Sequence, residues 1–239
     1  MCGRYALSSH PAAVALAFGL PHQPDIQPRY NIAPTQQVPI VRENAQGERE
    51  LVQVRWGLVP RSARDPSIGS RMITARAETI ATNGAFRHAF ARRRCLVPAT
   101  GFYEWRRTAK GKTPMHIGMR DGRPFGLAGL YERWLSPHGE VIDSCTIVTT
   151  DACDSLRSIH DRMPVIVPSG DYARWLDCSN ADAADLLVAW QGELHVHPVS
   201  ARVNAVANDD ASLCEAVAAE ESPDEAVDDA DAPEQLPLL

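Results

Sequence analysis

Short β-rich runs dominate this chain and follow one another with few helical segments between them. Residues 38–42 and 51–56 flank a turn-like sequence at residues 44–47, so we expect a hairpin there, and we expect a single strand over residues 95–105. The chain has no Rossmann or P-loop glycine pattern, no internal repeat and no alternation of strands with helices. We therefore predict an α+β single domain built on an antiparallel, partly barrel-like β-sheet flanked by short helices.

Charge divides the chain into a body and a tail. Nine acidic residues and no Lys or Arg lie between Glu215 and Leu239, whereas residues 1–214 carry 21 acidic and 24 basic side chains. A segment of Asp, Glu, Ala and Pro is too poor in large apolar groups to fold alone. We predict a folded domain over residues 1–214 and a flexible, disordered acidic tail over residues 215–239. The mildly basic body is compatible with nucleic-acid binding.

Composition argues against several other classes of protein. No run approaches the roughly 20 apolar residues of a membrane span, and the start lacks the basic-then-apolar order of a signal peptide. The six cysteines are scattered without a CxxC pair, so we expect neither a zinc site nor a disulfide framework. We predict a cytoplasmic protein that uses no metal and no cofactor and binds no membrane.

The second residue, Cys2, carries two nucleophiles once Met1 is removed, and the small side chain of Cys2 permits that removal. Its α-amine and thiol have ordinary pKa values of about 8 and 8.5, so both are partly reactive near neutral pH. An aldehyde can form an imine with the amine, and the thiol can then attack to close a five-membered thiazolidine ring. Alternatively, the amine can serve as general base for the thiol in acyl transfer.

Three consecutive arginines, residues 92–94, end a helix that we expect over residues 84–94. Positive charge suits the C-terminal end of a helix, where the helix dipole is negative. The run favours either a solvated helix end or a phosphate contact, and the sequence leaves both open.

Six short motifs follow one another along the body: Met1-Cys2-Gly3-Arg4-Tyr5, Arg29-Tyr30-Asn31-Ile32-Ala33-Pro34, Trp56-Gly57-Leu58-Val59-Pro60, Ala75-Arg76-Ala77-Glu78-Thr79, Gly101-Phe102-Tyr103-Glu104-Trp105 and Ile159-His160-Asp161-Arg162-Met163-Pro164. In this order they resemble the SRAP family, the SOS response-associated peptidases. The resemblance extends from Cys2 to about Asn208.

The resemblance implies that the chain senses abasic sites in single-stranded DNA and shields them as covalent DNA–protein crosslinks. An abasic deoxyribose equilibrates with a ring-opened aldehyde, which the amine and thiol of Cys2 can trap as a thiazolidine. The resemblance also allows self-processing of Met1, crosslink reversal and an AP-lyase activity. We expect a monomer that works on DNA in the nucleoid.

The same resemblance gives catalytic roles to two further residues. Glu104 looks like the family's active-site carboxylate, which positions the amine and relays protons. Partial burial among aromatic neighbours would raise its pKa. His160 looks like the family's acid–base histidine, suited to protonating the sugar ring oxygen and opening the ring.

Other motif residues are candidates for contacts to DNA. Arg4 and Arg76 are expected to bind phosphates, because a guanidinium matches phosphate oxygens. Glu78 could pair with either arginine and fix its direction. Asn31 could orient the backbone near the site.

Flat side chains could support the bases beside the lesion, as single-strand binders require. Trp56, Pro34 and Trp105 are the candidates, although core packing is an equal alternative for both tryptophans. The chain departs from the family at Thr74, where the resemblance would place Asn at the abasic site. Threonine is shorter and offers one hydroxyl, so a contact to the sugar is expected to be lost or bridged by water.

The chain ends in an apolar peptide on the acidic tether, residues 235–239. It is similar to the Gln-Leu-x-Leu-Phe/Leu peptide that binds the bacterial sliding clamp. Leu236, Leu238 and Leu239 would supply the apolar contacts, and Gln235 the polar one. Tethering would raise the local concentration of the protein at single-stranded DNA.

Two alternatives from other classes remain open at this stage. Glutamine amidotransferases with an N-terminal nucleophile also begin Met-Cys-Gly, so Cys2 could serve a cysteine amidohydrolase. Cys2 could equally be inert in a non-covalent single-stranded DNA-binding module.

Overall fold

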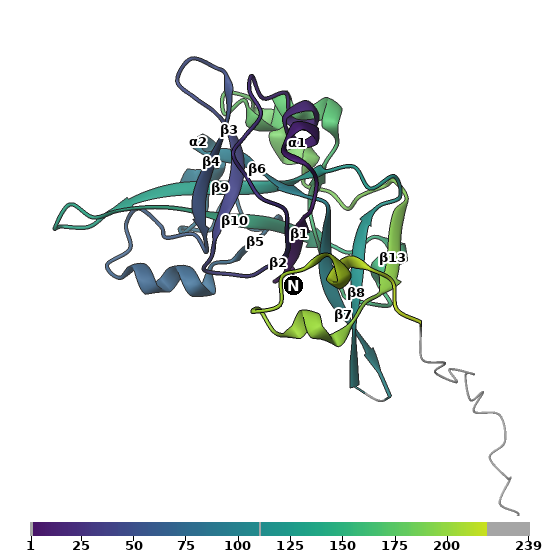
Figure 1. Cartoon of the computed structure of the whole chain (residues 1–239). Coiled ribbons are helices and arrows are strands. Elements are labelled where there is room, and N and C mark those ends of the chain that lie inside the picture. Colours follow the sequence, from purple (N-terminus) through teal and green to yellow (C-terminus); the bar gives the residue numbers. More distant parts are fainter. Residues whose placement is uncertain (1, 110, 219–239) are drawn as a thin grey trace, which may run out of the picture.

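A five-stranded barrel forms the centre of the molecule in the computed structural model, which describes residues 2–109 and 111–218. The barrel strands are β3 (Gln37–Glu43), β4 (Arg49–Trp56), β6 (Arg94–Ala99), β9 (Phe125–Leu135) and β10 (Val141–Asp151). They pair in the order β10-β4-β3-β6-β9, and β9 pairs again with β10 to close the barrel (Figure 1). The predicted barrel-based α+β fold is confirmed.

The pairing of the barrel strands is antiparallel except at one seam. The expected hairpin is present, since β3 and β4 pair from Gln37 opposite Arg55 to Glu43 opposite Arg49. Strand β4 then runs parallel to β10, with Arg55 opposite Ser144. This parallel closure differs from the all-antiparallel expectation.

Outside the barrel, two short strands pair with the C-terminal end of β10. Strand β5 (Thr74–Arg76) lies parallel to it, with Arg76 opposite Thr149, and β11 (Arg162–Pro164) lies antiparallel, with Arg162 opposite Asp151. A further strand, β12 (Ile166–Val167), adds to β9. Motifs distant in the sequence therefore meet at one end of β10.

A second, antiparallel sheet has the order β13-β8-β7-β1-β2. Its strands are β1 (Tyr5–Leu7), β2 (Arg29–Ile32), β7 (Gly101–Thr108), β8 (Gly111–Met119) and β13 (Leu194–Pro198). The single strand that the sequence suggested over residues 95–105 is wrong, because the chain passes from the barrel to this sheet at Thr100. Gly101 leaves room for the His116 side chain, because a Cβ there would lie 2.2 Å from Nε2 of His116.

Helices are short and lie at the periphery (Figure 1). The α-helices are α1 (Pro11–Phe18), α2 (Arg87–Arg92) and α3 (Tyr172–Leu176). The 3-10 helices are η1 (Pro66–Arg71), η2 (Asp154–Leu156), η3 (Ser169–Asp171), η4 (Ala181–Leu186), η5 (Ala201–Asn204) and η6 (Ala211–Cys214). Within residues 2–109 and 111–218, none of the helices has both the length and the apolar character needed to cross a bilayer. The tail residues Gln235, Leu236, Leu238 and Leu239 lie outside the described residues.

The three consecutive arginines take different directions. Arg94 is only 4% exposed, and its guanidinium donates to the carbonyl oxygens of Trp175 at 2.7 Å and Asn180 at 3.2 Å. It also lies over the Trp175 ring, 5.6 Å from the centroid. Arg92, in contrast, is exposed at the end of α2. Arg94 therefore fastens α3 and the following loop to the barrel.

We predict that Arg94→Met lowers the free energy of unfolding by about 2–4 kcal/mol, because buried carbonyl oxygens lose their donors. Urea denaturation followed by tryptophan fluorescence would measure the change. Arg92→Met is the matched control and should stay within about 0.5 kcal/mol of the parent. Equal effects of the two substitutions would contradict this assignment.

Candidate active site

The pairing of β1 with β7 places Cys2 beside Glu104. Tyr5 lies opposite Phe102, and the N–H of Tyr103 donates to the carbonyl of Arg4 at 2.9 Å. In an antiparallel pair this register continues one residue at a time, so Gly3 faces Glu104 and Cys2 follows next to it. Cys2 is completely buried in this arrangement.

Burial controls the chemistry of the Cys2 thiol. It raises the pKa of the thiol well above its ordinary value, and the negative charge of Glu104 raises it further. A hydrogen bond from the Arg4 backbone N–H lowers the pKa, but less strongly. The thiol is therefore neutral near pH 7, and it becomes a nucleophile only when a neighbouring group takes its proton.

Glu104 provides a buried carboxyl group at the required place. It is 4% exposed, and burial raises its pKa above the ordinary value, while the charge of His160 opposes that rise. Glu104 and His160 line one pocket of about 600 Å³. A carboxyl group with a raised pKa can exchange protons near neutral pH, as a general acid–base requires. The structure thus brings Cys2, Glu104 and His160 together.

His160 lies in the turn between η2 and β11. Its Nδ1 is 2.9 Å from the backbone N–H of Arg162 and 2.8 Å from Oδ1 of Asp161. One nitrogen cannot accept from the amide and donate to the carboxylate at once. We assign Nδ1 as the acceptor of the amide, because the Asp161 side chain is 86% exposed and its contact is screened by water. In the neutral ring Nε2 then carries the proton.

Three cationic side chains at the pocket rim were missed by sequence reasoning: Arg107, Lys112 and Arg157. The first two come from the β7–β8 hairpin, and Arg157 follows η2. The basic residues within 106–112 could have indicated Arg107 and Lys112, but the sequence does not show that their hairpin lies beside His160. The rim therefore carries positive charge next to the carboxyl and imidazole groups.

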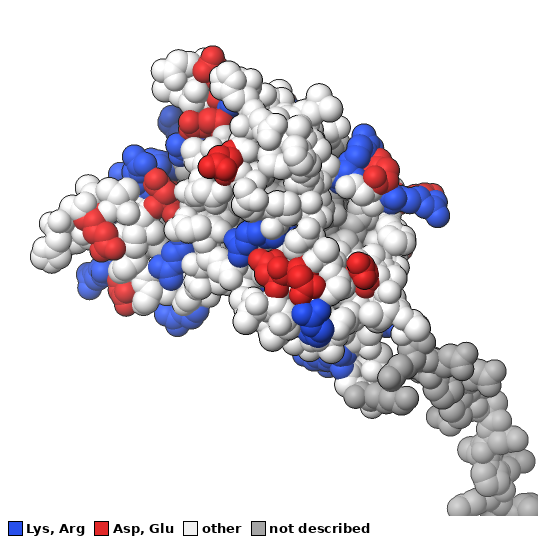
Figure 2. All heavy atoms as spheres, in the orientation of Figure 1, with Lys and Arg blue, Asp and Glu red and all other residues white. Residues whose placement is uncertain are grey.

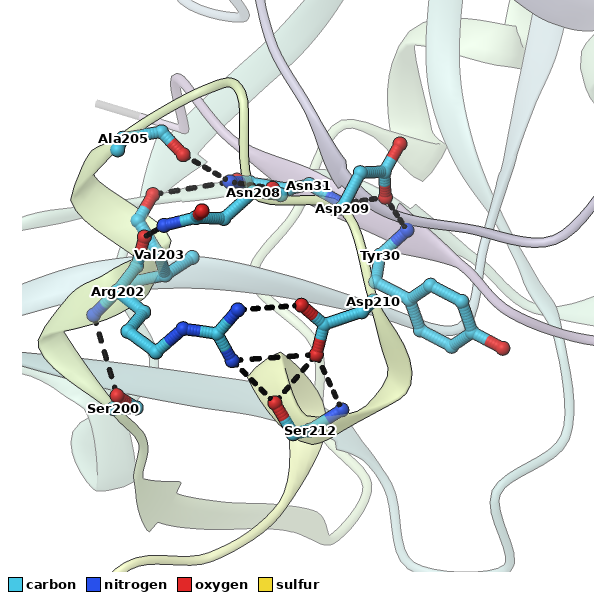
Figure 3. A network of polar contacts seen from close by, with 10 residues as sticks. All are labelled: Tyr30, Asn31, Ser200, Arg202, Val203, Ala205, Asn208, Asp209, Asp210 and Ser212. Atoms are coloured by element: carbon cyan, nitrogen blue, oxygen red, sulfur yellow. Dashed lines mark hydrogen bonds and ion pairs between the residues drawn. The ribbon is translucent and has the colours of Figure 1, made fainter.

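Arg4 and Asn31 hold the C-terminal strap, which we define as residues 200–217. The Arg4 guanidinium donates to Asn31 Oδ1 at 2.7 Å and to the Val203 carbonyl at 2.6 Å. The buried Asn31 amide donates to the carbonyls of Val203 and Ala205 and, at 2.7 Å, to that of Asn208 (Figure 3). Arg4 is half-buried and bonded within the chain, and the Asn31 amide binds three backbone carbonyls of the strap.

Glu78 pairs with an arginine that the sequence did not suggest for it. Both of its carboxylate oxygens accept from Arg162, at 2.7 and 3.0 Å, and this contact lowers the pKa of Glu78. Arg162 also donates to Asp151 and, at 2.7 Å, to the carbonyl of Thr149. The pair joins the segment after β5 to β10 and β11. Arg76 is exposed on β5.

The predicted flat side chains have different surroundings. Trp56 is fully buried against Tyr5, with ring centroids 5.4 Å apart, and donates to the carbonyl of Ile73. A buried ring has no face for a base, so Trp56 is a core residue here, which corrects its expected role in stacking. Pro34 and Trp105 are half-buried, and Trp105 donates to Asn204 in the strap.

Thr74, the departure from the expected Asn, is half-buried on β5 opposite Ile147. Among the described residues, no group of three or more His, Cys, Asp or Glu could hold a metal ion.

Fold and site together define a class of protein. This class has a closed β-barrel, a buried second-residue cysteine just before a strand of an adjoining sheet, and a carboxyl–imidazole pair in a basic pocket near that cysteine. The chain belongs to the SOS response associated peptidase (SRAP) family, whose model matches residues 1–206.

Similar proteins cover nearly the whole chain. It is 37% identical over 223 residues to the abasic site processing protein YoqW of Bacillus subtilis, covering 90% of this chain and 99% of the relative. It is 30% identical to YedK of Escherichia coli, covering 91% and 100%, and 32% identical to HMCES of Gallus gallus, covering 87% and 76%. Both are also named abasic site processing proteins. A crystal structure of a Bacteroides thetaiotaomicron protein superposes with a TM-score of 0.81 at 26% identity, covering 91% of this chain and all of the other.

We predict that Glu104→Gln gains stability relative to the parent as the pH rises from 4 to 7. The pKa of Glu104 is raised in the folded protein, so above its ordinary value of 4.5 the folded state holds more protons than the unfolded state, and stability falls as pH rises. Glutamine has no such proton, and the gain should be about 1.4 kcal/mol for each unit of pKa rise. Urea denaturation at several pH values would measure it. A difference that does not change with pH would contradict the prediction.

Proposed function

We propose that this protein processes abasic sites in single-stranded DNA by a covalent reaction at Cys2. The main supporting observation is that Glu104 and His160 line one pocket with a cationic rim, and that the buried Cys2 lies next to Glu104. The proposal is supported by relatives that span the chain and are named abasic site processing proteins. The anionic backbone of the substrate suits Arg107, Lys112 and Arg157 at the rim and the exposed Arg76 nearby.

The proposed reaction begins with opening of the abasic sugar. His160 in its imidazolium form gives the Nε2 proton to the ring oxygen, and Glu104 passes the proton of the C1 hydroxyl back to the imidazole, which leaves an aldehyde at C1 and a hydroxyl at C4. The free amine of Cys2, after removal of Met1, adds to this carbon, and water leaves to give an imine. Glu104 accepts the amine proton and returns a proton to the leaving hydroxyl.

Ring closure follows from the thiol of the same residue. The sulfur adds to the imine carbon, the C=N π-bond becomes a nitrogen lone pair, and the thiol proton moves to nitrogen through Glu104. The product is a thiazolidine, with no net oxidation or reduction. The neutral, buried thiol fits this order, because its proton is needed on nitrogen in the closing step.

We predict a heat-stable, shifted band on a denaturing gel when the mature protein meets single-stranded DNA with one abasic site. Cys2→Ala should abolish the band, because without the thiol the imine cannot close to a thiazolidine. Cys153→Ala is the matched control, since it removes a partly exposed thiol that has no part in the reaction scheme. Thr74→Asn should speed band formation, because the longer amide restores a contact to the sugar.

Other outcomes of the same experiment distinguish the alternatives. DNA affinity that Cys2→Ala leaves unchanged, with no covalent band from the parent, would instead favour a non-covalent binding module. Ammonia release from glutamine that depends on Cys2 would favour an amidohydrolase.

We further propose that residues 235–239 bind the bacterial sliding clamp and bring the protein to replicating DNA. The support is the sequence of this segment, which lies outside the described residues. Leu238 and Leu239 would fill an apolar pocket on the clamp, and the acidic linker would stay away from DNA.

We predict that the double substitution Leu238→Ala, Leu239→Ala weakens clamp binding at least tenfold, because two buried leucine side chains are truncated. Calorimetry with a purified bacterial clamp would measure this. The control Asp231→Asn changes the linker only and should bind like the parent. Crosslinking to isolated DNA should be equal in all three proteins; clamp affinity that survives the leucine substitutions would contradict the assignment.

A further inference from the structure

A second basic pocket lies on the barrel, away from Cys2. It has a volume of about 700 Å³ and is formed by α2, β3, β9, β10 and the loop that contains Arg61. Five arginines line it: Arg42, Arg61, Arg92, Arg93 and Arg133. Figure 2 shows Lys and Arg side chains interspersed with Asp and Glu on the left of the molecule.

A buried carboxylate, Glu132, holds residues that line this pocket. Glu132 is 2% exposed and contacts Arg93 Nε and His88 Nδ1, both at 3.1 Å. It also accepts from the backbone N–H of Arg133 at 3.2 Å. A buried carboxylate with three donors is fully engaged, so it orients Arg93 and His88 and stays inaccessible to a ligand.

The pocket keeps an excess of positive charge. Arg42 pairs with Glu50 at 2.7 Å, and Arg133 binds Asp143 through two hydrogen bonds of 2.7 Å. With Glu132, three carboxylates therefore face five guanidinium groups. Within the described residues, neither Arg61 nor Arg92 has a carboxylate within 4 Å, so these two side chains carry the excess.

The lining also identifies the chemical class of ligand. The aromatic ring of Tyr131 lies under Arg42 and Arg93, 5.1 and 5.9 Å from their guanidinium carbons. A ring engaged in this way is poorly placed to stack on a base, and the pocket has little other apolar surface. Guanidinium groups match phosphate oxygens with paired N–H donors. This lining suits an anion with more than one phosphate group.

We propose that this second pocket binds the phosphodiester backbone of the DNA strand that carries the lesion, at a distance from the reacting sugar. Asp143 in the pocket and Asp151 beside Arg162 lie on the same strand, β10, eight residues apart, which corresponds to roughly 26 Å. The inference rests on the proposed function, which supplies DNA at the far end of β10. Contact to phosphate alone would add affinity without sequence preference.

The test compares two double variants that remove equal charge. Arg61→Gln, Arg92→Gln removes the excess charge of the pocket, and Arg120→Gln, Arg123→Gln removes two exposed arginines in the β8–β9 turn. Fluorescence anisotropy would give the affinity for an undamaged 25-nucleotide strand and a 5-nucleotide strand across salt concentrations. Thermal unfolding would confirm that both variants are folded.

For the long strand, the pocket variant should bind several-fold more weakly, and its slope of log affinity against log salt should fall by about 1.4, or 0.7 for each lost phosphate contact. The control variant should match the parent. The pocket substitutions should weaken binding of the short strand less than that of the long strand, because a short strand can bind at the Cys2 site without using the pocket. Equal behaviour of the two variants with the long strand would overturn the proposal.

Two further measurements separate DNA binding in this pocket from polyphosphate binding and from the reaction at Cys2. Pyrophosphate that stabilises the parent but not the pocket variant, with unchanged DNA binding, would assign the pocket to free polyphosphates and overturn the DNA assignment. Crosslinking of a 5-nucleotide abasic strand should be equal in all proteins. Its failure in the parent would refute the proposed reaction at Cys2, while the salt slopes would still report on the pocket.

Discussion

The pairing of β1 with β7 is the constraint on which the site depends. It fixes the register that sets Cys2 beside Glu104, and it leaves only a few residues between the start of the chain and the sheet. A chain terminus usually has few contacts and frays readily. Here Arg4 donates hydrogen bonds to Asn31 and to the carbonyl of Val203 in the strap, so contacts outside the β1–β7 pair also hold the first residues in place.

Burial gives the site both its chemistry and its thermodynamic cost. It raises the pKa of both the Cys2 thiol and the Glu104 carboxyl group, and each would be better solvated at the surface. The core of the barrel and the strap contacts must offset this cost. The opposite arrangement occurs between Glu78 and Arg162, where contact between unlike charges stabilises both ionised forms.

Much of the architecture follows from local sequence, and most of the tertiary detail does not. The β3–β4 hairpin was predictable because two β-rich runs flank a turn, and ordered motifs identified Cys2, Glu104 and His160 as a group. The break at Thr100 was not predictable, since residues 95–105 have the local pattern of one strand and the two sheets are set by strands distant in the sequence. The Arg162 partner of Glu78 and the pocket around Arg92 depend on strands that are distant in the sequence.

The contact between Arg4 and the Val203 carbonyl spans 199 positions of the chain, which has a consequence for how the protein is made. Synthesis proceeds from the N-terminus, so the cysteine emerges first while the residues that hold its neighbour emerge among the last. Contacts between such distant residues also form late, because they require closure of a very long loop. A nascent chain on the ribosome therefore has its reactive residue without the surroundings that direct it, and the site matures only when translation is nearly complete.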